Sequence, residues 1–107
     1  MLGNDEKSCE SDKQQFKKAY AAAYKRDYQG QRNVSYCLSA GCGGAVQNNA
    51  TLGCAWRLVI LASGSAEVDN TDISNKRVYC DRLAPDEQET ARAQAQELMR
   101  RIYKREL

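Results

Sequence analysis

A chain of 107 residues, of which 42% are hydrophobic and 28% charged, has the size and composition of one globular domain, which excludes whole-chain disorder. Its formal net charge of +2, with both signs interspersed, argues against a nucleic-acid-binding protein, and its longest apolar run, Leu58–Ala62, is too short to cross a bilayer. Because the chain has no histidine, it lacks the usual general base and the commonest metal ligand, and we expect no enzyme, cofactor or metal site.

Five cysteines in so small a chain indicate disulfides and an oxidising compartment. A structural zinc site usually has two closely spaced cysteine pairs, but here Cys54 and Cys80 are far apart, so zinc is disfavoured. The preferred pairing is Cys37–Cys42 and Cys54–Cys80, which leaves Cys9 unpaired, although spacing alone does not fix the connectivity. Residues 1–5 lack the apolar core of a secretory signal, so we expect a mature form with an added start.

Residues 1–9 are polar and are expected to be flexible, whereas residues 10–107 are expected to form a single helical domain. The first helix should begin near Glu10, with Ser11 or Asp12 as its cap. Its apolar stripe has helical spacing, which indicates core packing: Phe16, Ala19, Tyr20, Ala23 and Tyr24.

A second helix follows the break at residues 27–30 and runs to about Leu38, with Gly41 in the left-handed position after its end. The most hydrophobic segment, Leu52–Ser63, is expected to be the central helix, and a buried strand over Trp56–Leu61 is the alternative. Arg57 is the one charge in this segment, so we expect it to pair with an acidic residue or to reach an edge.

A fourth helix should start with a cap within Asp69–Asp72 and run to about Leu83. Its expected inner residues are Ile73, Tyr79, Cys80 and Leu83. Pro85 opens a fifth helix, whose buried stripe is Ala91, Ala95, Leu98, Met99 and Ile102. The predicted fold is therefore all-α: four to five antiparallel helices in a small, disulfide-stabilised bundle.

The segment Gly43–Gly53 combines glycines, two adjacent asparagines and no charge, between Cys42 and Cys54. Glycine and asparagine favour tight or left-handed backbone, so the segment is predicted to be a shaped loop. Its neutral polar groups can dock into another protein without desolvating a charge. The candidate partner-binding residues are Gly44, Gln47, Asn48, Asn49, Ala50 and Thr51.

Two sequence patterns resemble known families. The run AYAAAYKRDY at Ala19–Tyr28 resembles the start of a Sel1- or tetratricopeptide-like helical hairpin, with Arg26 where that pattern has glycine. The fuller pattern is CLSAGCGGA, then LGCAWRLVILASGS, then a later cysteine before an alanine-rich helix. Over about Cys9–Tyr103 it resembles the periplasmic immunity proteins of type VI secretion systems that are paired with the third family of cell-wall amidase effectors.

That resemblance implies a largely helical periplasmic protein, often a dimer, that inhibits a cognate effector. The effector would be a papain-like cysteine amidase that cuts the peptide cross-links of peptidoglycan, and the inhibitor would occupy its cleft. No inhibitory residues carry over from the resemblance, so the loop Gly44–Thr51 is assigned from its own residues. The alternative is a Sel1- or tetratricopeptide-like adaptor, but the sequence has only one convincing copy of a repeat that should recur every ~34–36 residues.

Overall fold

The structure is a computed structural model that describes the backbone of residues 2–107 and the side chains of residues 11–107. The described residues form the helices α1 (Leu2–Tyr24), α2 (Tyr28–Ala40), the 3-10 turn η1 (Cys42–Gly44), α3 (Ala50–Ala62), α4 (Asn70–Cys80) and α5 (Pro85–Tyr103). The described residues contain no strand, so the all-α prediction is confirmed.

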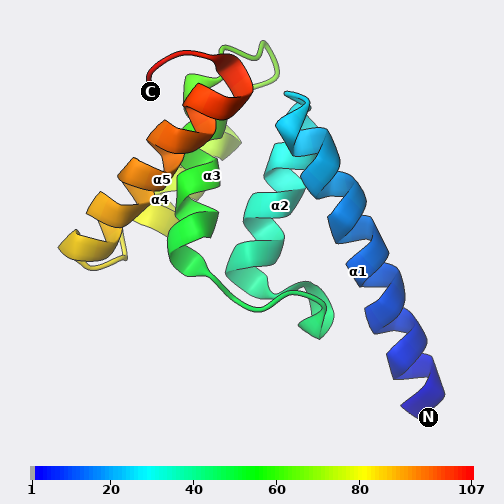
Figure 1. The fold of residues 1–107 in the computed structure, drawn as a ribbon. Helices are drawn as coiled ribbons and strands as arrows, with labels where there is room; N and C mark the ends of the chain where they lie inside the picture. Colours follow the sequence, from blue (N-terminus) through cyan, green and yellow to red (C-terminus); the bar gives the residue numbers. More distant parts are fainter. Residues whose placement is uncertain (1) are drawn as a thin grey trace.

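Helix α3 is the centre of the arrangement, and α2, α4 and α5 all pack directly on it (Figure 1). Helix α1 packs along α2 and reaches α3 through aromatic rings, since the Tyr24 and Trp56 ring centroids lie 5.6 Å apart. The chain thus forms two successive helix pairs, α1/α2 and α3/α4, followed by α5. The α2–α3 connection, which includes η1, lies at the opposite end of the molecule from the C-terminus (Figure 1).

The core is built around α3 because that helix is apolar on nearly every side. Trp56 and Ile60 are fully buried, and Met99 of α5 and Val34 of α2 belong to the same buried cluster as Trp56. The five residues of the predicted α5 stripe, Ala91 to Ile102, are all buried, as expected. Burial of each large apolar side chain contributes about 1.5–3 kcal/mol, so these contacts hold the helices in place.

The helix ends follow local sequence signals. Asp27 caps α2 by accepting a 2.7 Å hydrogen bond from the Gly30 amide, and Gly41 ends α2 in the left-handed region at φ 83°. Asp69 and Asp72 form a reciprocal capping box at the start of α4. At α5, Pro85 occupies the first turn, and the acidic side chains that follow it favour the positive end of the helix dipole.

Two glycines permit close helix packing. A Cβ atom on Gly30 would lie 2.9 Å from the Cβ atom of Ala22 in α1. A Cβ atom on Gly53 of α3 would collide with the Ser39 hydroxyl of α2. Ser35, one turn earlier in α2, donates a 2.8 Å hydrogen bond to the Gly53 carbonyl oxygen. These contacts bring α2 against both α1 and α3.

Several sequence-based expectations are corrected. Helix α1 begins at Leu2 rather than near Glu10, so Ser11 and Asp12 are inside the helix and do not cap it. Helix α4 ends at Cys80, and Ile73, expected to be an inner residue, is 44% exposed. The face of α4 that packs inward is set by the buried Asp72, a polar residue that a hydrophobic pattern does not detect. The alternative strand over Trp56–Leu61 is wrong, because those residues are helical.

Candidate functional site

The α2–α3 loop is closed at its start by a disulfide. Cys37, in the last turn of α2, bonds to Cys42 in η1, and their Cα atoms lie 4.8 Å apart. Between them the chain reverses at Gly41, where a positive φ favours glycine. The disulfide therefore holds η1 against the end of α2.

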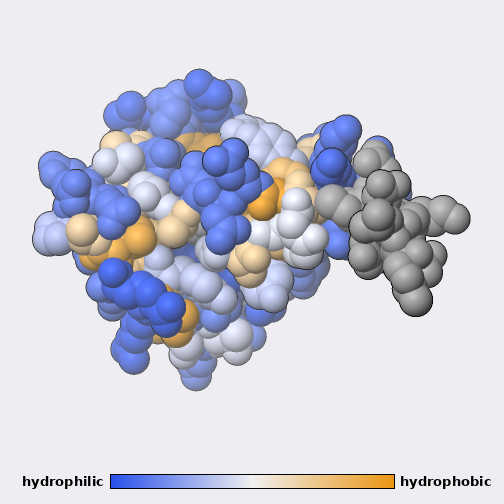
Figure 2. Space-filling view, turned by 90° about the horizontal axis from the view of Figure 1, so that it is seen from below, coloured by the Kyte–Doolittle hydropathy of each residue, from blue (hydrophilic) through white to orange (hydrophobic). Residues whose placement is uncertain are grey.

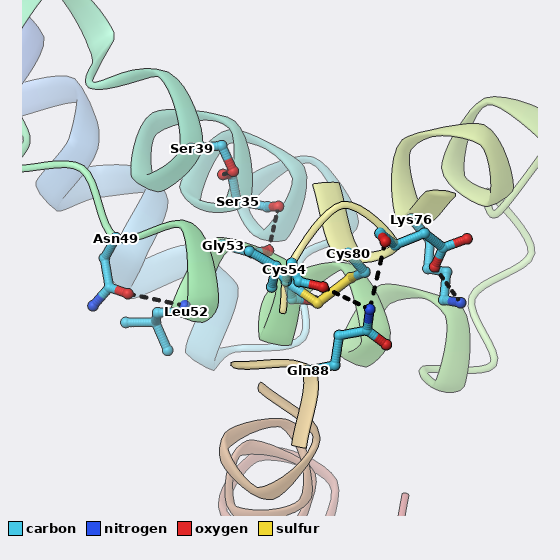
Figure 3. The surroundings of a disulfide bond; sticks show 11 residues. Ser35, Ser39, Asn49, Leu52, Gly53, Cys54, Lys76, Cys80 and Gln88 are labelled. Atoms are coloured by element: carbon cyan, nitrogen blue, oxygen red, sulfur yellow. Dashed lines mark hydrogen bonds and ion pairs between the residues drawn. A yellow bond between two sulfur atoms is a disulfide. The ribbon is translucent and has the colours of Figure 1, made fainter. Parts of the chain in front are cut away.

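Backbone hydrogen bonds hold the rest of the loop. The Val46 amide donates to the Gly41 carbonyl oxygen at 3.1 Å, and the Asn49 amide donates to the Leu38 carbonyl oxygen at 2.8 Å. The Asn49 side chain in turn accepts a 3.0 Å hydrogen bond from the Leu52 amide and so caps α3 (Figure 3). The loop is thus anchored at both ends and has a defined shape in between.

The structure divides the predicted partner-binding residues into two groups. Gly44, Gln47 and Asn48 lie in the loop and are exposed. Asn49 is exposed but its carboxamide caps a helix, and Ala50 and Thr51 are in the first turn of α3 rather than in the loop. The loop is shorter at its C-terminal side than predicted, because Asn49 caps α3 and the helix begins at Ala50.

Asn48 also supports the loop from within. A Cβ atom on Gly41 would lie 2.6 Å from the Asn48 Oδ1 atom, so this side chain packs over the turn. By contrast, Gly44 has no heavy atom within 4 Å of where its Cβ atom would be. Gly44 and Gln47 are therefore the positions most open to a partner.

A pocket of about 220 Å³ lies beside the loop, between α1 and α2, and is lined in part by the Cys37–Cys42 disulfide, Phe16 and Tyr36. Asp12 of α1 lines the same pocket and approaches η1, since a Cβ atom on Gly43 would lie 3.0 Å from its Oδ2 atom. Seen from this end of the molecule, hydrophobic residues form small separate patches among hydrophilic ones (Figure 2). This side of the molecule therefore mixes apolar patches with hydrophilic residues.

The second disulfide joins Cys54 of α3 to Cys80 of α4, with Cα atoms 5.0 Å apart (Figure 3). Both predicted pairings are confirmed, and the side chain of Cys9 lies outside the described residues. Because the four sulfurs are in disulfides, none is a thiolate ligand for zinc. Among the side chains from Ser11 to Leu107, no group of three or more potential metal-ligating residues occurs.

A polar cluster that sequence patterns do not predict is buried between α2 and α4. Asp72 is 1% exposed and accepts a 2.6 Å hydrogen bond from the Tyr28 hydroxyl and a 3.1 Å hydrogen bond from the Asp69 amide. Arg32 approaches the other carboxylate oxygen at 3.6 Å. Burial first, and then the hydrogen bond to Asp72, raise the pKa of Tyr28 to about 12. The polar capping motif at Asp69 was the only sequence signal near this cluster.

Arg57 neither pairs closely with an acid nor reaches an exposed edge, contrary to expectation. It is 3% exposed, and its guanidinium carbon lies 5.2 Å from the centroid of the Tyr79 ring. Burial lowers the pKa of Arg57 because it disfavours the charged form. The apolar residues around Arg57 in the sequence give no sign of what lies opposite it, which is set by α4.

Comparison of the chain with protein-family models, with curated proteins and with solved structures gave no match. None of the described helices is both long and apolar enough to span a membrane. The two disulfides are consistent with an oxidising compartment outside the cytoplasm.

Proposed function

We propose that this protein is a periplasmic immunity protein that inhibits a peptidoglycan-cleaving amidase of a type VI secretion system by inserting its α2–α3 loop into the active-site cleft. The observation that carries the proposal is the loop itself, which is uncharged, exposed at Gly44 and Gln47, and braced by the Cys37–Cys42 disulfide. The resemblance of the surrounding sequence to immunity proteins supplies the kind of partner.

Bracing favours inhibition because association costs the entropy of every segment that becomes ordered in the complex. The disulfide, the Gly41 turn and the Asn49 cap fix this loop before it meets a partner. Its amide side chains can pair with the backbone groups of a peptide-binding cleft without the desolvation cost of a charge. A rigid neutral loop therefore suits occlusion of a papain-like cleft, which normally accepts an extended peptide.

The periplasm is the compartment in which this proposal places the protein, since peptidoglycan and the amidase meet there and disulfides persist there. The cognate amidase is the proposed partner, and a homodimer is a further part of the proposal. We propose no catalytic activity, no nucleic-acid partner and no membrane partner for the chain.

The test is inhibition of the amidase encoded beside this gene, measured as release of cleaved peptide from peptidoglycan at increasing inhibitor concentration. The variant is Gln47→Lys, and the matched control is Ser74→Lys, which adds the same charge at an exposed position of α4. A lysine forced into a closed interface is desolvated without a partner, so Gln47→Lys should weaken inhibition by about tenfold or more. The Ser74→Lys variant should inhibit as the wild type does.

Equal inhibition by both lysine variants would show that the loop does not enter the cleft. Asn49 is not a suitable position for this test, because its replacement also removes the cap of α3. Circular dichroism on both variants should give wild-type helicity, so that a change in inhibition reflects the interface.

A protein-binding adaptor is the second candidate, favoured by the two successive helix pairs α1/α2 and α3/α4. In such arrays each pair packs on the next, as α2 packs on α3 here. If the wild-type protein binds the amidase without reducing its activity, the adaptor is the better description.

A further inference from the structure

A groove of about 380 Å³ lies between α2 and α4 and is separate from the α2–α3 loop. Its charged lining consists of Arg57 from α3 and Arg32 from α2, with Tyr79 of α4 beside them. Its neutral polar lining includes Asn33 and Asn75. The groove therefore combines two guanidinium groups with neutral side chains that can donate and accept hydrogen bonds.

Arg57 lacks hydrogen-bond partners at two of its nitrogen atoms. Its Nε and Nη1 atoms are buried, and neither has an acceptor among the described residues. Arginine remains protonated in proteins, so the side chain holds a charge that is 97% removed from solvent. The face of the Tyr79 ring, 5.2 Å away, offsets part of that cost but accepts no conventional hydrogen bond.

The charges around the groove do not cancel. Asp72 is the one buried carboxylate nearby, and it is approached by Arg32 at 3.6 Å while its Oδ2 atom accepts hydrogen bonds from Tyr28 and the Asp69 amide. Two guanidinium groups and one carboxylate leave one positive charge. A ligand that completes the pairing should therefore carry a single negative charge.

We propose that this groove binds a carboxylate group, which pairs with the Arg57 guanidinium while the rest of the ligand contacts Asn33 and Asn75. The flat, two-oxygen carboxylate matches the guanidinium fork, and its single charge matches the local imbalance. The group can come from a free small carboxylate or from the C-terminus of a peptide. This site is independent of the proposed immunity function, since it lies on α2, α3 and α4 rather than on the loop.

The alternative to a bound carboxylate is a partner for Arg57 within the protein itself. The Asp72 Oδ1 atom also lacks a hydrogen bond, so a side-chain shift could pair it with Arg57 and leave no site for an added anion. In that case added carboxylates would have no specific effect on the protein. The experiment must therefore separate a specific carboxylate effect from a general effect of salt.

The first measurement is thermal unfolding of the wild-type protein with sodium acetate, with neutral acetamide as the matched control and with ionic strength held constant by sodium chloride. Acetate at about ten times its dissociation constant should raise the midpoint by roughly 5 °C, and acetamide should not. N-acetyl-trialanine with a free C-terminus and its C-terminal amide form the second pair. A shift from the free peptide acid at concentrations where acetate gives none assigns the site to peptide C-termini, and equal shifts assign it to small carboxylates.

The second measurement places the carboxylate in the groove by mutation, which avoids deleting a buried arginine. Asn75→Glu puts the charge in the groove, and Ser74→Glu puts the same charge on the next residue of α4, which is exposed. We expect Asn75→Glu to raise the unfolding midpoint relative to Ser74→Glu and to abolish the acetate effect. The proposal is overturned if acetate shifts the unfolding midpoint no more than acetamide and the peptide acid no more than its amide. It is also overturned if Asn75→Glu unfolds at a lower temperature than Ser74→Glu.

Discussion

The replacement Tyr28→Phe removes one hydroxyl from the buried cluster between α2 and α4 and leaves the ring in place. In the wild type this hydroxyl donates a 2.6 Å hydrogen bond to the Asp72 carboxylate, which is 1% exposed. After the replacement, the carboxylate keeps the Asp69 amide and the more distant Arg32 guanidinium as its partners. No water can easily replace the lost donor, because both residues are buried.

The expected loss follows from the type of hydrogen bond. A bond to a charged acceptor contributes about 1.5–3 kcal/mol to the free energy of unfolding, more than a bond between neutral groups. A loss of about 2 kcal/mol in a domain of this size lowers the unfolding midpoint by roughly 8 °C. Urea unfolding followed by circular dichroism at pH 7 measures this difference directly.

The same hydroxyl gives the prediction a pH dependence. The pKa of Tyr28 is raised to about 12 in the folded protein from 10.0, mainly by burial. Between these values the unfolded chain loses the Tyr28 proton and the folded protein keeps it, so the stability that Tyr28 contributes is complete below about pH 10 and is lost as the pH rises toward 12. The difference in stability between wild type and Tyr28→Phe should therefore narrow above pH 10.

The matched control is Tyr36→Phe, since Tyr36 is 52% exposed and its replacement should change the free energy of unfolding by no more than about 0.5 kcal/mol. A loss below 0.5 kcal/mol for Tyr28→Phe at pH 7 would refute the reasoning, because it would mean that the buried carboxylate does not depend on this donor. A difference that stays constant from pH 9 to pH 11 would refute the assignment of the raised pKa.

Two further predictions concern the disulfide between α3 and α4 and the cap of α3. The double replacement of Cys54 and Cys80 by serine should lower the free energy of unfolding by about 3.5 kcal/mol in the chain-entropy model, since the bridge joins residues 26 apart, and urea unfolding of the variant measures it. Asn49→Ala should cost about 1 kcal/mol through the lost cap, whereas Gln47→Ala should cost less than about 0.5 kcal/mol, and equal losses would contradict the different roles assigned to these residues.

Much of the fold follows from signals that lie within one helix. The apolar stripe of α5, the left-handed Gly41 and the cap at Asp69 each depend on neighbours along the chain, and the structure confirms all three. The disulfide pairing was also predicted correctly, because Cys54 and Cys80 lie in adjacent predicted helices and Cys37 and Cys42 flank a glycine turn.

The polar cluster was not predictable because its partners come from different helices. Nothing in the sequence near Asp72 indicates that Tyr28, 44 residues earlier, donates to it. The surroundings of Arg57 are likewise set by the packing of α4 on α3, which brings Tyr79 over its guanidinium group. Local patterns placed these residues on helices, but only the tertiary arrangement decided which side chains became buried together.

The α2–α3 loop was predicted correctly in its shape but not in where it ends. Its composition predicted a shaped loop between Cys42 and Cys54, and the positive φ angles of Gly43 and Gly44 with the backbone hydrogen bond from Asn49 confirm a defined shape up to residue 49. The end of the loop was placed too late, because asparagine is common both in loops and at helix caps. The capping hydrogen bond of Asn49 separates these two uses and leaves Gln47 as the best single probe of the loop.

The proposed function requires the loop to enter the cleft of an amidase, and the most direct measurement is a photo-crosslink from position 47 in the proposed complex with an amidase encoded beside this gene. A crosslinking amino acid at Gln47 should attach to the amidase peptides that line its cleft, beside the nucleophilic cysteine, and the same amino acid at Ser74 should not. Crosslinks from position 47 to a remote surface of the enzyme, or an inhibited complex in which position 47 gives no crosslink, would contradict the account.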